Sequence, residues 1–260
     1  MSKELLSLSE EAARLGGRIL QQWRSRFTAR EKSPANLVTE ADEASQLAIF
    51  ELIERRIPGC RFLGEEGLLI DDRPSPIRWV IDPLDGTSNY VHGFPYYAVS
   101  IGVEKDGKLV AGAIYDPTRD EMFTAERGSG AYLNGTRLKV SATKEVSHAM
   151  CMASLPVKAD RYHEAVERFL RALDVAQSVQ RSGSAALNLC CVAAGRVDAF
   201  WSTSLKPWDM AAGVLLVEEA GGNISKVDGS RFVLDEPDVL ATNGSTLHQQ
   251  TIDVLMRKSA

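Results

Sequence analysis

The 260-residue chain carries 30 basic and 35 acidic residues, a formal net charge of −5 at pH 7. A hydrophobic content of 44% is ordinary for a globular protein and excludes a disordered, collagen-like or disulfide-scaffold chain. The negative balance also disfavours a nucleic-acid partner, because such affinity comes from basic residues that neutralise phosphates.

Two helices are predicted at the N-terminal end. Apolar residues recur at three- and four-residue steps through residues 4–27, which is typical of an amphipathic helix. The second helix begins after Thr39, since Thr39 and Asp42 have the spacing of a capping box, and it ends at residues 58–59, Pro-Gly. No apolar segment here resembles a signal peptide or a membrane anchor, so we expect a cytoplasmic protein without membrane contact.

Short strands follow in the first part of the chain. Residues 61–64 and 77–82 each run from apolar residues into an acidic one, and they flank a polar loop over residues 67–76. From residue 98 to 140, strands of four to seven residues alternate with turns rich in Gly, Asp and Asn. This pattern predicts an antiparallel meander.

After about residue 147, strands and helices alternate, which is typical of an α/β arrangement. Helices are expected near residues 161–173, 184–194, 209–220 and 246–256, and strands near 149–154, 197–201, 222–226 and 239–242. We therefore expect one compact unit with two parts. Residues 1–145 form an α+β half with the meander, and residues 146–260 form an α/β half.

Acidic residues gather in four short segments at the ends of predicted elements. The segments are residues 39–42, 64–67, 82–87 and 208–213. Taken singly, the first and last are consistent with helix caps and the second with a solvated turn. The third segment, Asp-Pro-Leu-Asp-Gly-Thr, favours ligation, because three carboxyl or hydroxyl side chains around Pro and Gly suit no structural role better.

The third segment combines cation ligands with a possible anion site. The predicted strand places Asp82 at its end, and Asp85 follows three residues later. The amides of Gly86 and Thr87, if they open a helical turn, form an anion site beside these carboxylates. Two carboxylates about 4 Å apart repel by roughly 4 kcal/mol at an effective dielectric of about 20. Bound cations remove this cost, and oxygen ligands favour hard ions such as Mg²⁺.

Together and in this order, the four segments resemble the signature of the inositol monophosphatase family, the lithium-sensitive, magnesium-dependent phosphatases. The similarity extends from about Leu5 to the C-terminal end. It implies a layered αβαβα sandwich of the sugar-phosphatase type, of mixed α+β and α/β class, which forms a homodimer. It also implies hydrolysis of a small phosphate monoester with two to three Mg²⁺ ions per active site.

The resemblance assigns five residues to the metals. Glu65, Asp82 and the carbonyl of Leu84 would hold the first ion. Asp82, Asp85 and Asp209 would hold the second, so that Asp82 bridges the two. A third, weaker ion would lie near Glu65, mostly on water.

The resemblance also implies how water is activated. Thr87 and Glu65 would orient and deprotonate the water that attacks phosphorus, and Asp42 would lie in the outer shell of the third ion. The metals and the amides of Gly86 and Thr87 would meet the charge on the phosphoryl oxygens. We therefore expect Asp42, Glu65 and Thr87 to be the catalytic side chains.

Contacts to the rest of the substrate are expected from the second half of the chain. Family members that act on inositol phosphates use a Gly-Ser/Thr-Ala segment, which Gly183, Ser184 and Ala185 match. They commonly have a glutamate seven residues before the last metal aspartate, where this chain has Ser202. The expected substrate site comprises these four residues with Glu65, Leu84, Asp85, Gly86, Thr87 and Asp209. Serine brings no charge, so specificity for inositol is left open.

Three functions are therefore considered. The leading one is hydrolysis of inositol 1-phosphate, and the second is hydrolysis of histidinol phosphate, fructose 1,6-bisphosphate or a 3′-phosphonucleotide. The third is a non-catalytic regulator that binds a protein or RNA. Retention of the proposed metal ligands and of Thr87 disfavours a catalytically dead scaffold, and the acidic balance disfavours RNA.

Overall fold

A computed structural model of the chain describes residues 2–33 and 36–257. The helices are α1 (Ser2–Trp23), α2 (Glu40–Arg56), α3 (Thr87–Val91), α4 (Glu164–Leu173), α5 (Ala185–Ala193), α6 (Pro207–Glu219) and α7 (Leu247–Met256), with a 3-10 turn η1 (Val146–His148). The strands are β1 (Ala29–Ser33), β2 (Asn36–Thr39), β3 (Arg61–Gly64), β4 (Leu69–Ile70), β5 (Ile77–Asp85), β6 (Ala98–Lys105), β7 (Lys108–Asp116), β8 (Glu121–Glu126), β9 (Gly130–Leu133), β10 (Thr136–Arg137), β11 (Met150–Ala153), β12 (Ser178–Gln180), β13 (Ala199–Ser202), β14 (Asn223–Ser225) and β15 (Val239–Thr242).

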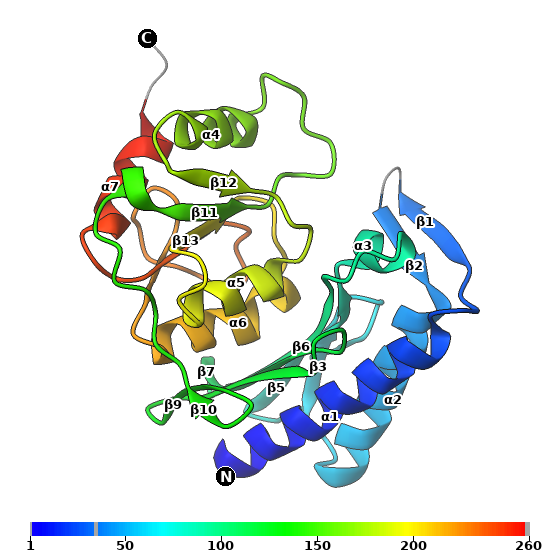
Figure 1. Ribbon diagram of the computed structural model, residues 1–260. Coiled ribbons are helices and arrows are strands. Elements are labelled where there is room, and N and C mark those ends of the chain that lie inside the picture. The colour runs from blue at the N-terminus through cyan, green and yellow to red at the C-terminus, as the bar shows by residue number, and fades with distance from the viewer. Residues whose placement is uncertain (1, 34–35, 258–260) are drawn as a thin grey trace.

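Helices and sheets stack in five alternating layers (Figure 1). An eight-stranded sheet has the order β10-β9-β8-β7-β6-β5-β3-β4, and α1 and α2 cover its outer face. Helices α5 and α6 separate this sheet from a five-stranded sheet of order β12-β11-β13-β15-β14. Helices α4 and α7 cover the far face of the second sheet. The αβαβα sandwich expected from the sequence is confirmed.

Most predicted elements are present, with differences at their ends. The meander is confirmed, because each strand from β5 to β10 pairs antiparallel with the next. Helix α1 ends at Trp23 and not at residue 27, since the chain turns there toward the hairpin of β1 and β2. This hairpin, β4 and β12 were not predicted from the sequence. Strand β1 reads Ala-Arg-Glu-Lys-Ser, which has no apolar alternation to indicate a strand.

Apolar side chains fill the spaces between the layers in three clusters. The largest surrounds α5 and α6, and almost every side chain of α5 is buried. A helix that is apolar all round is typical of a buried position between two layers. Neither α5 nor any other helix within the described ranges is long and apolar enough to span a membrane.

Two glycines allow α6 to approach the eight-stranded sheet closely. Gly102 on β6 and Gly112 on β7 are cross-strand partners. A Cβ at Gly102 would lie 2.5 Å from the Cβ of Ala211, and one at Gly112 would lie 3.0 Å from the Cα of Ala212. Since α6 carries Asp209 in its first turn, this contact sets the position of Asp209 relative to the sheet.

Replacing Gly102 with valine is expected to overpack this contact. Overpacking a core typically costs about 1–3 kcal/mol, which corresponds to a fall of roughly 3–10 °C in the melting temperature for a chain of this size. Thermal unfolding followed by circular dichroism measures the change. Lys108→Val, at the exposed start of β7, is the control and should leave the melting temperature nearly unchanged. Equal melting temperatures for Gly102→Val and the unmodified protein would contradict the packing argument.

Candidate active site

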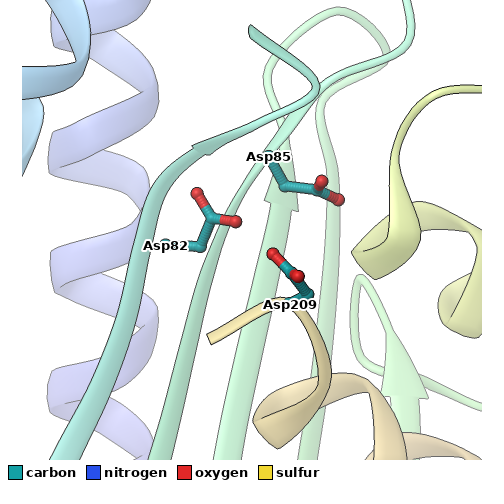
Figure 2. A group of neighbouring side chains, drawn as sticks. All are labelled: Asp82, Asp85 and Asp209. Carbon is teal, nitrogen blue, oxygen red and sulfur yellow. The ribbon is translucent and has the colours of Figure 1, made fainter. Parts of the chain in front are cut away.

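Three aspartates from two elements bring their carboxylates together (Figure 2). Asp82 and Asp85 belong to the carboxyl end of β5, and Asp209 lies in the first turn of α6. One carboxylate oxygen from each lies within 4.8 Å of the others. The fold therefore joins two of the acidic segments that the sequence analysis singled out. We call these three residues the aspartate cluster.

A bulge in β5 turns Asp82 and Asp85 toward the same side. In a regular strand, residues three apart face opposite sides of the sheet. Here Asp82 is opposite Ser100 and Asp85 is opposite Ala98, so β5 contains one residue more than β6 across this stretch. The bulge also places the Leu84 N–H within 3.0 Å of Asp82 Oδ1, to which it donates a hydrogen bond.

Asp85 is held by the N-terminus of α5. Its Oδ2 accepts hydrogen bonds from the Ser184 hydroxyl at 2.6 Å and from the Ala186 N–H at 2.7 Å. Ser184 also caps α5 by accepting from the Leu187 N–H. The side chain of Ser184 is completely buried. Ser184 therefore orients Asp85. A contact between Ser184 and a substrate was predicted from the sequence, whereas in the structure its hydroxyl is buried against Asp85.

Asp42 and Asp209 both occupy the third position of a helix. Asp42 Oδ2 accepts from the Thr39 N–H at 2.9 Å and from the Thr39 hydroxyl at 2.5 Å, which confirms the predicted capping box. Asp209 Oδ2 accepts from the Lys206 N–H at 2.7 Å at the start of α6. In each case one oxygen satisfies the helix start. The other oxygen of each carboxylate is left for the site.

Thr87 opens the helical turn that the sequence analysis expected after residue 85. Gly86 precedes it with a φ of +95°, and a Cβ there would lie 3.0 Å from the Tyr96 carbonyl oxygen, so only glycine suits this position. The Thr87 hydroxyl lies 3.1 Å from Asp42 Oδ1 and 3.2 Å from the Leu84 carbonyl oxygen. Its single proton can be donated to either acceptor.

Glu65 follows β3 directly, beside the carboxyl end of β5. Its N–H donates to the Ile81 carbonyl at 3.2 Å, which places its backbone next to Asp82. Glu65 lies outside the group of three that converge within 4.8 Å. Its charge nevertheless raises the pKa of Asp42, and of every member of the aspartate cluster. The structure therefore places Asp42, Glu65 and the aspartate cluster close enough for the charge of Glu65 to act on all the others.

Burial and mutual repulsion disfavour the charged forms of these acids. Burial is the main cause that raises the pKa of Asp42 and of Asp85 to about 6 and that of Asp209 to about 8. Burial, with the neighbouring acids, also raises the pKa of Asp82 well above its usual value. No ion pair within the described residues involves the aspartate cluster. Its oxygen donors therefore suit a hard cation.

A cleft of about 500 Å³ lies against the aspartate cluster. Its lining residues come from both halves of the chain: Leu37, Asp85, Gly86, Thr87, Ser88, Asn89, Ser154, Leu155, Val157, Arg181, Ser182, Gly183, Ala185, Leu205 and Asp209. Of the substrate residues expected from the second half, Gly183 and Ala185 are part of this lining. The cleft is large enough for a small organic phosphate beside the carboxylates.

Ser202 differs from the sequence-based expectation. It ends β13, where it pairs with Val239 of β15, and its side chain is completely buried. Its hydroxyl lies 3.4 Å from the hydroxyl of Ser204, and Ser202 does not line the cleft. The expected contact between Ser202 and a substrate stays a prediction, and it would require a change at this buried end of β13.

The sequence analysis assigned no role to several residues of the cleft wall. Asn89 donates from Nδ2 to the Ser182 carbonyl at 2.9 Å and to the Tyr96 carbonyl at 2.7 Å, and so ties α3 to the 181–184 loop. Leu155 and Val157 come from the segment after β11. Residues in such segments follow no helical or strand period, so the pattern of the sequence contained no signal for them.

The chain is similar to known proteins in sequence and in fold. A family model described as the inositol monophosphatase family matches residues 1–259. The chain is 43% identical over 213 residues to an inositol-1-monophosphatase of Mesorhizobium japonicum, covering 82% of this chain and 80% of that protein. It is 39% identical over 247 residues to the Nus factor SuhB of Pseudomonas aeruginosa, covering 92% and 91%. The crystal structure of extragenic suppressor protein suhB from Bartonella henselae superposes with a TM-score of 0.93 at 36% identity, covering 98% of this chain and 100% of that one.

The raised pKa values of Asp42, Asp85 and Asp209 predict that stabilisation by Mg²⁺ depends on pH. A carboxyl whose pKa is higher in the folded than in the unfolded state stabilises the fold at low pH, and this contribution is lost as pH rises through the folded pKa. The metal-free protein should therefore lose stability as pH rises from about 4, the ordinary pKa of aspartate, to about 8, the folded pKa of Asp209. If Mg²⁺ is the cation that this site holds, it would bind the ionised carboxylates, and its stabilising effect should grow over the same range.

Differential scanning calorimetry of the chelator-treated protein, with and without Mg²⁺, tests this expectation. When the Mg²⁺ concentration is about 100 times the dissociation constant, binding at one site raises the free energy of unfolding by roughly 2.7 kcal/mol. This corresponds to a rise of about 5–10 °C in the melting temperature. We expect an increment of this size at pH 8.5 and less than about half of it at pH 5.5. The control is the same buffer with a sodium salt in place of the Mg²⁺ salt, at equal ionic strength. An increment independent of pH would contradict the electrostatic account.

Proposed function

This chain belongs to the inositol monophosphatase family, and from that membership we propose that it hydrolyses a small phosphate monoester with Mg²⁺, with inositol 1-phosphate as the leading substrate. The chain is a phosphatase by its family. The observation that carries the finer proposal is the aspartate cluster. Its three carboxylates, two of them buried and that of Asp209 half-buried, converge beside a cleft without a basic partner among the described residues.

The oxygen donors of the site fit Mg²⁺. Asp82, Asp85 and Asp209 would hold one ion. Glu65, Asp82 and the carbonyl of Leu84 would hold a second, and a third would lie near Glu65 with Asp42 farther out. When bound, such ions lower the pKa of water and neutralise charge on the phosphoryl group.

Thr87, Asp42 and Glu65 are proposed to prepare the attacking water. Thr87 donates its proton to Asp42 Oδ1 or to the Leu84 carbonyl. Its oxygen lone pairs are then free to accept one proton of the water in a hydrogen bond and to orient it. The Glu65 carboxylate accepts the proton that the water loses as it attacks phosphorus. Thr39 holds Asp42 in place through two hydrogen bonds.

Asp209 is assigned to the leaving-group side of the phosphoryl group, and the N-terminus of α3 to the phosphoryl oxygens. Asp209 would hold the water that returns a proton to the leaving alkoxide. The amides of Gly86 and Thr87 would donate to phosphoryl oxygens. The 181–185 wall of the cleft, with Gly183 and Ala185, would contact the organic part of the substrate.

Two observations keep a second substrate class in view. Ser202 places no charge at the cleft, because it is neutral and buried, and relatives of this chain carry names other than inositol monophosphatase. Hydrolysis of histidinol phosphate, fructose 1,6-bisphosphate or a 3′-phosphonucleotide is therefore the alternative. From the same family resemblance we propose inhibition by Li⁺, a homodimer and a cytoplasmic location. A purely regulatory role without catalysis is disfavoured by the intact acidic site.

Asp209→Asn tests the assignment of Asp209 to the leaving-group side. We expect kcat to fall by about 10²–10³-fold at saturating Mg²⁺, while the KM for substrate stays within about threefold, because the loss concerns the transition state more than binding. Steady-state kinetics with phosphate detection measure both constants. Lys206→Ala, whose exposed side chain precedes α6, is the control. Near-normal turnover of Asp209→Asn at saturating Mg²⁺ would refute the assignment.

A substrate panel tests the proposed activity itself. Phosphate release is measured with Mg²⁺, with and without Li⁺, from inositol 1-phosphate, histidinol phosphate, fructose 1,6-bisphosphate and a 3′-phosphonucleotide. We expect the highest kcat/KM for inositol 1-phosphate and inhibition by Li⁺. A preference of more than about tenfold for another member of the panel would establish the alternative, and no release from any member would overturn both.

A further inference from the structure

Gln46 of α2 holds the backbone of the turn that carries Glu65. Its Oε1 accepts a hydrogen bond from the Glu66 N–H at 3.0 Å, and its Nε2 donates one to the Glu66 carbonyl at 3.0 Å. One side-chain amide therefore satisfies both backbone polar groups of one residue, as a neighbouring strand would. Gln46 is 8% exposed, so few water molecules compete for these hydrogen bonds. We call this pair of hydrogen bonds the glutamine clamp.

The neighbouring residue leaves room for the clamp. A Cβ at Gly64 would lie 2.4 Å from Gln46 Oε1, closer than real Cβ contacts. The Gly64 N–H donates to the Leu68 carbonyl at 2.7 Å, which closes the turn on itself. The turn around Glu65 is therefore closed at its base and attached to α2.

The same face of α2 reaches the active site through Asp42. Residues 42 and 46 are four apart and thus lie one above the other on a helix. Both side chains are buried. Asp42 reaches the Thr87 hydroxyl, and Gln46 reaches Glu66 one turn later. One rigid helix face therefore sets Asp42 and the turn of Glu65 relative to each other.

We propose that Gln46 is a positioning residue for Glu65. The glutamine clamp fixes the 64–67 turn while the Glu65 N–H bonds to Ile81, one residue before Asp82. Between these two attachments the Glu65 carboxylate is directed toward the aspartate cluster, and Gln46 raises metal affinity only through Glu65. This inference rests on the proposed function, because it takes Glu65 to be a metal ligand.

A double-mutant cycle tests this dependence. Gln46→Met keeps the length of the side chain and removes both hydrogen bonds of the clamp. Its effect on Mg²⁺ affinity is measured by isothermal titration calorimetry, in the unmodified protein and in Glu65→Gln. We expect affinity to weaken by about 5- to 20-fold in the unmodified protein and by less than about twofold in Glu65→Gln, since residues that act through one group are not additive. Equal weakening in both backgrounds, or none in the first, would overturn the proposal.

Two further variants complete the experiment. Gly64→Ala forces a methyl group against Gln46 Oε1 and should repeat the pattern of Gln46→Met, so it decides the question if Gln46→Met does not fold. Leu47→Ala is the matched control, because Leu47 follows Gln46 on α2, is 57% exposed and lines a pocket together with Gln46 and Glu66. It should leave Mg²⁺ affinity unchanged.

The cycle also separates this proposal from the proposed function. If Glu65→Gln weakens Mg²⁺ binding and Gln46→Met does not, only the positioning role of Gln46 fails. If Glu65→Gln leaves Mg²⁺ affinity unchanged, the assignment of Glu65 as a metal ligand fails, and the role of Gln46 fails with it.

Discussion

The mutual repulsion of three converging carboxylates, two of them buried and one half-buried, is the constraint on which the rest of the site depends. At an effective dielectric of about 20, charges 4–5 Å apart repel by roughly 3–4 kcal/mol for each pair, and burial adds a desolvation cost. The protein offsets part of this with hydrogen bonds from Leu84, Ser184, Ala186 and Lys206 to the aspartate cluster. These donors orient the carboxylates but bring no positive charge, so a bound cation would stabilise the ionised forms that burial and repulsion disfavour.

Helix starts supply much of this orientation. Asp42 and Asp209 each use one oxygen to satisfy the beginning of their own helix and keep the other for the site. Ser184 caps α5 and donates to Asp85 at the same time. A helix start has unpaired N–H groups in any case, so placing an acid there serves helix stability and site geometry together. The same side chain can therefore stabilise the start of a helix and belong to the candidate site.

Residue patterns specify the elements of this fold better than they specify burial. The meander and the layered sandwich followed from apolar periodicity and from family resemblance, and both are confirmed. The hairpin of β1 and β2 was missed because its residues have no apolar alternation. Ser184 matches a residue of a family motif, and Ser202 stands where the family commonly has a glutamate. Both side chains are buried. A motif identifies a position in the chain, whereas burial depends on what packs over it.

The sequence by itself determined which residues are the candidates for the chemistry, because Asp-Pro-Leu-Asp-Gly-Thr and the other acidic segments depend only on residue type and order. Only the tertiary structure decided how they meet. The bulge in β5 turns Asp82 and Asp85 to one side, and the contact of α6 with two glycines of the sheet places Asp209 beside them. These are contacts between distant segments, and their distances follow from packing volume and strand register, which no local pattern of residues encodes.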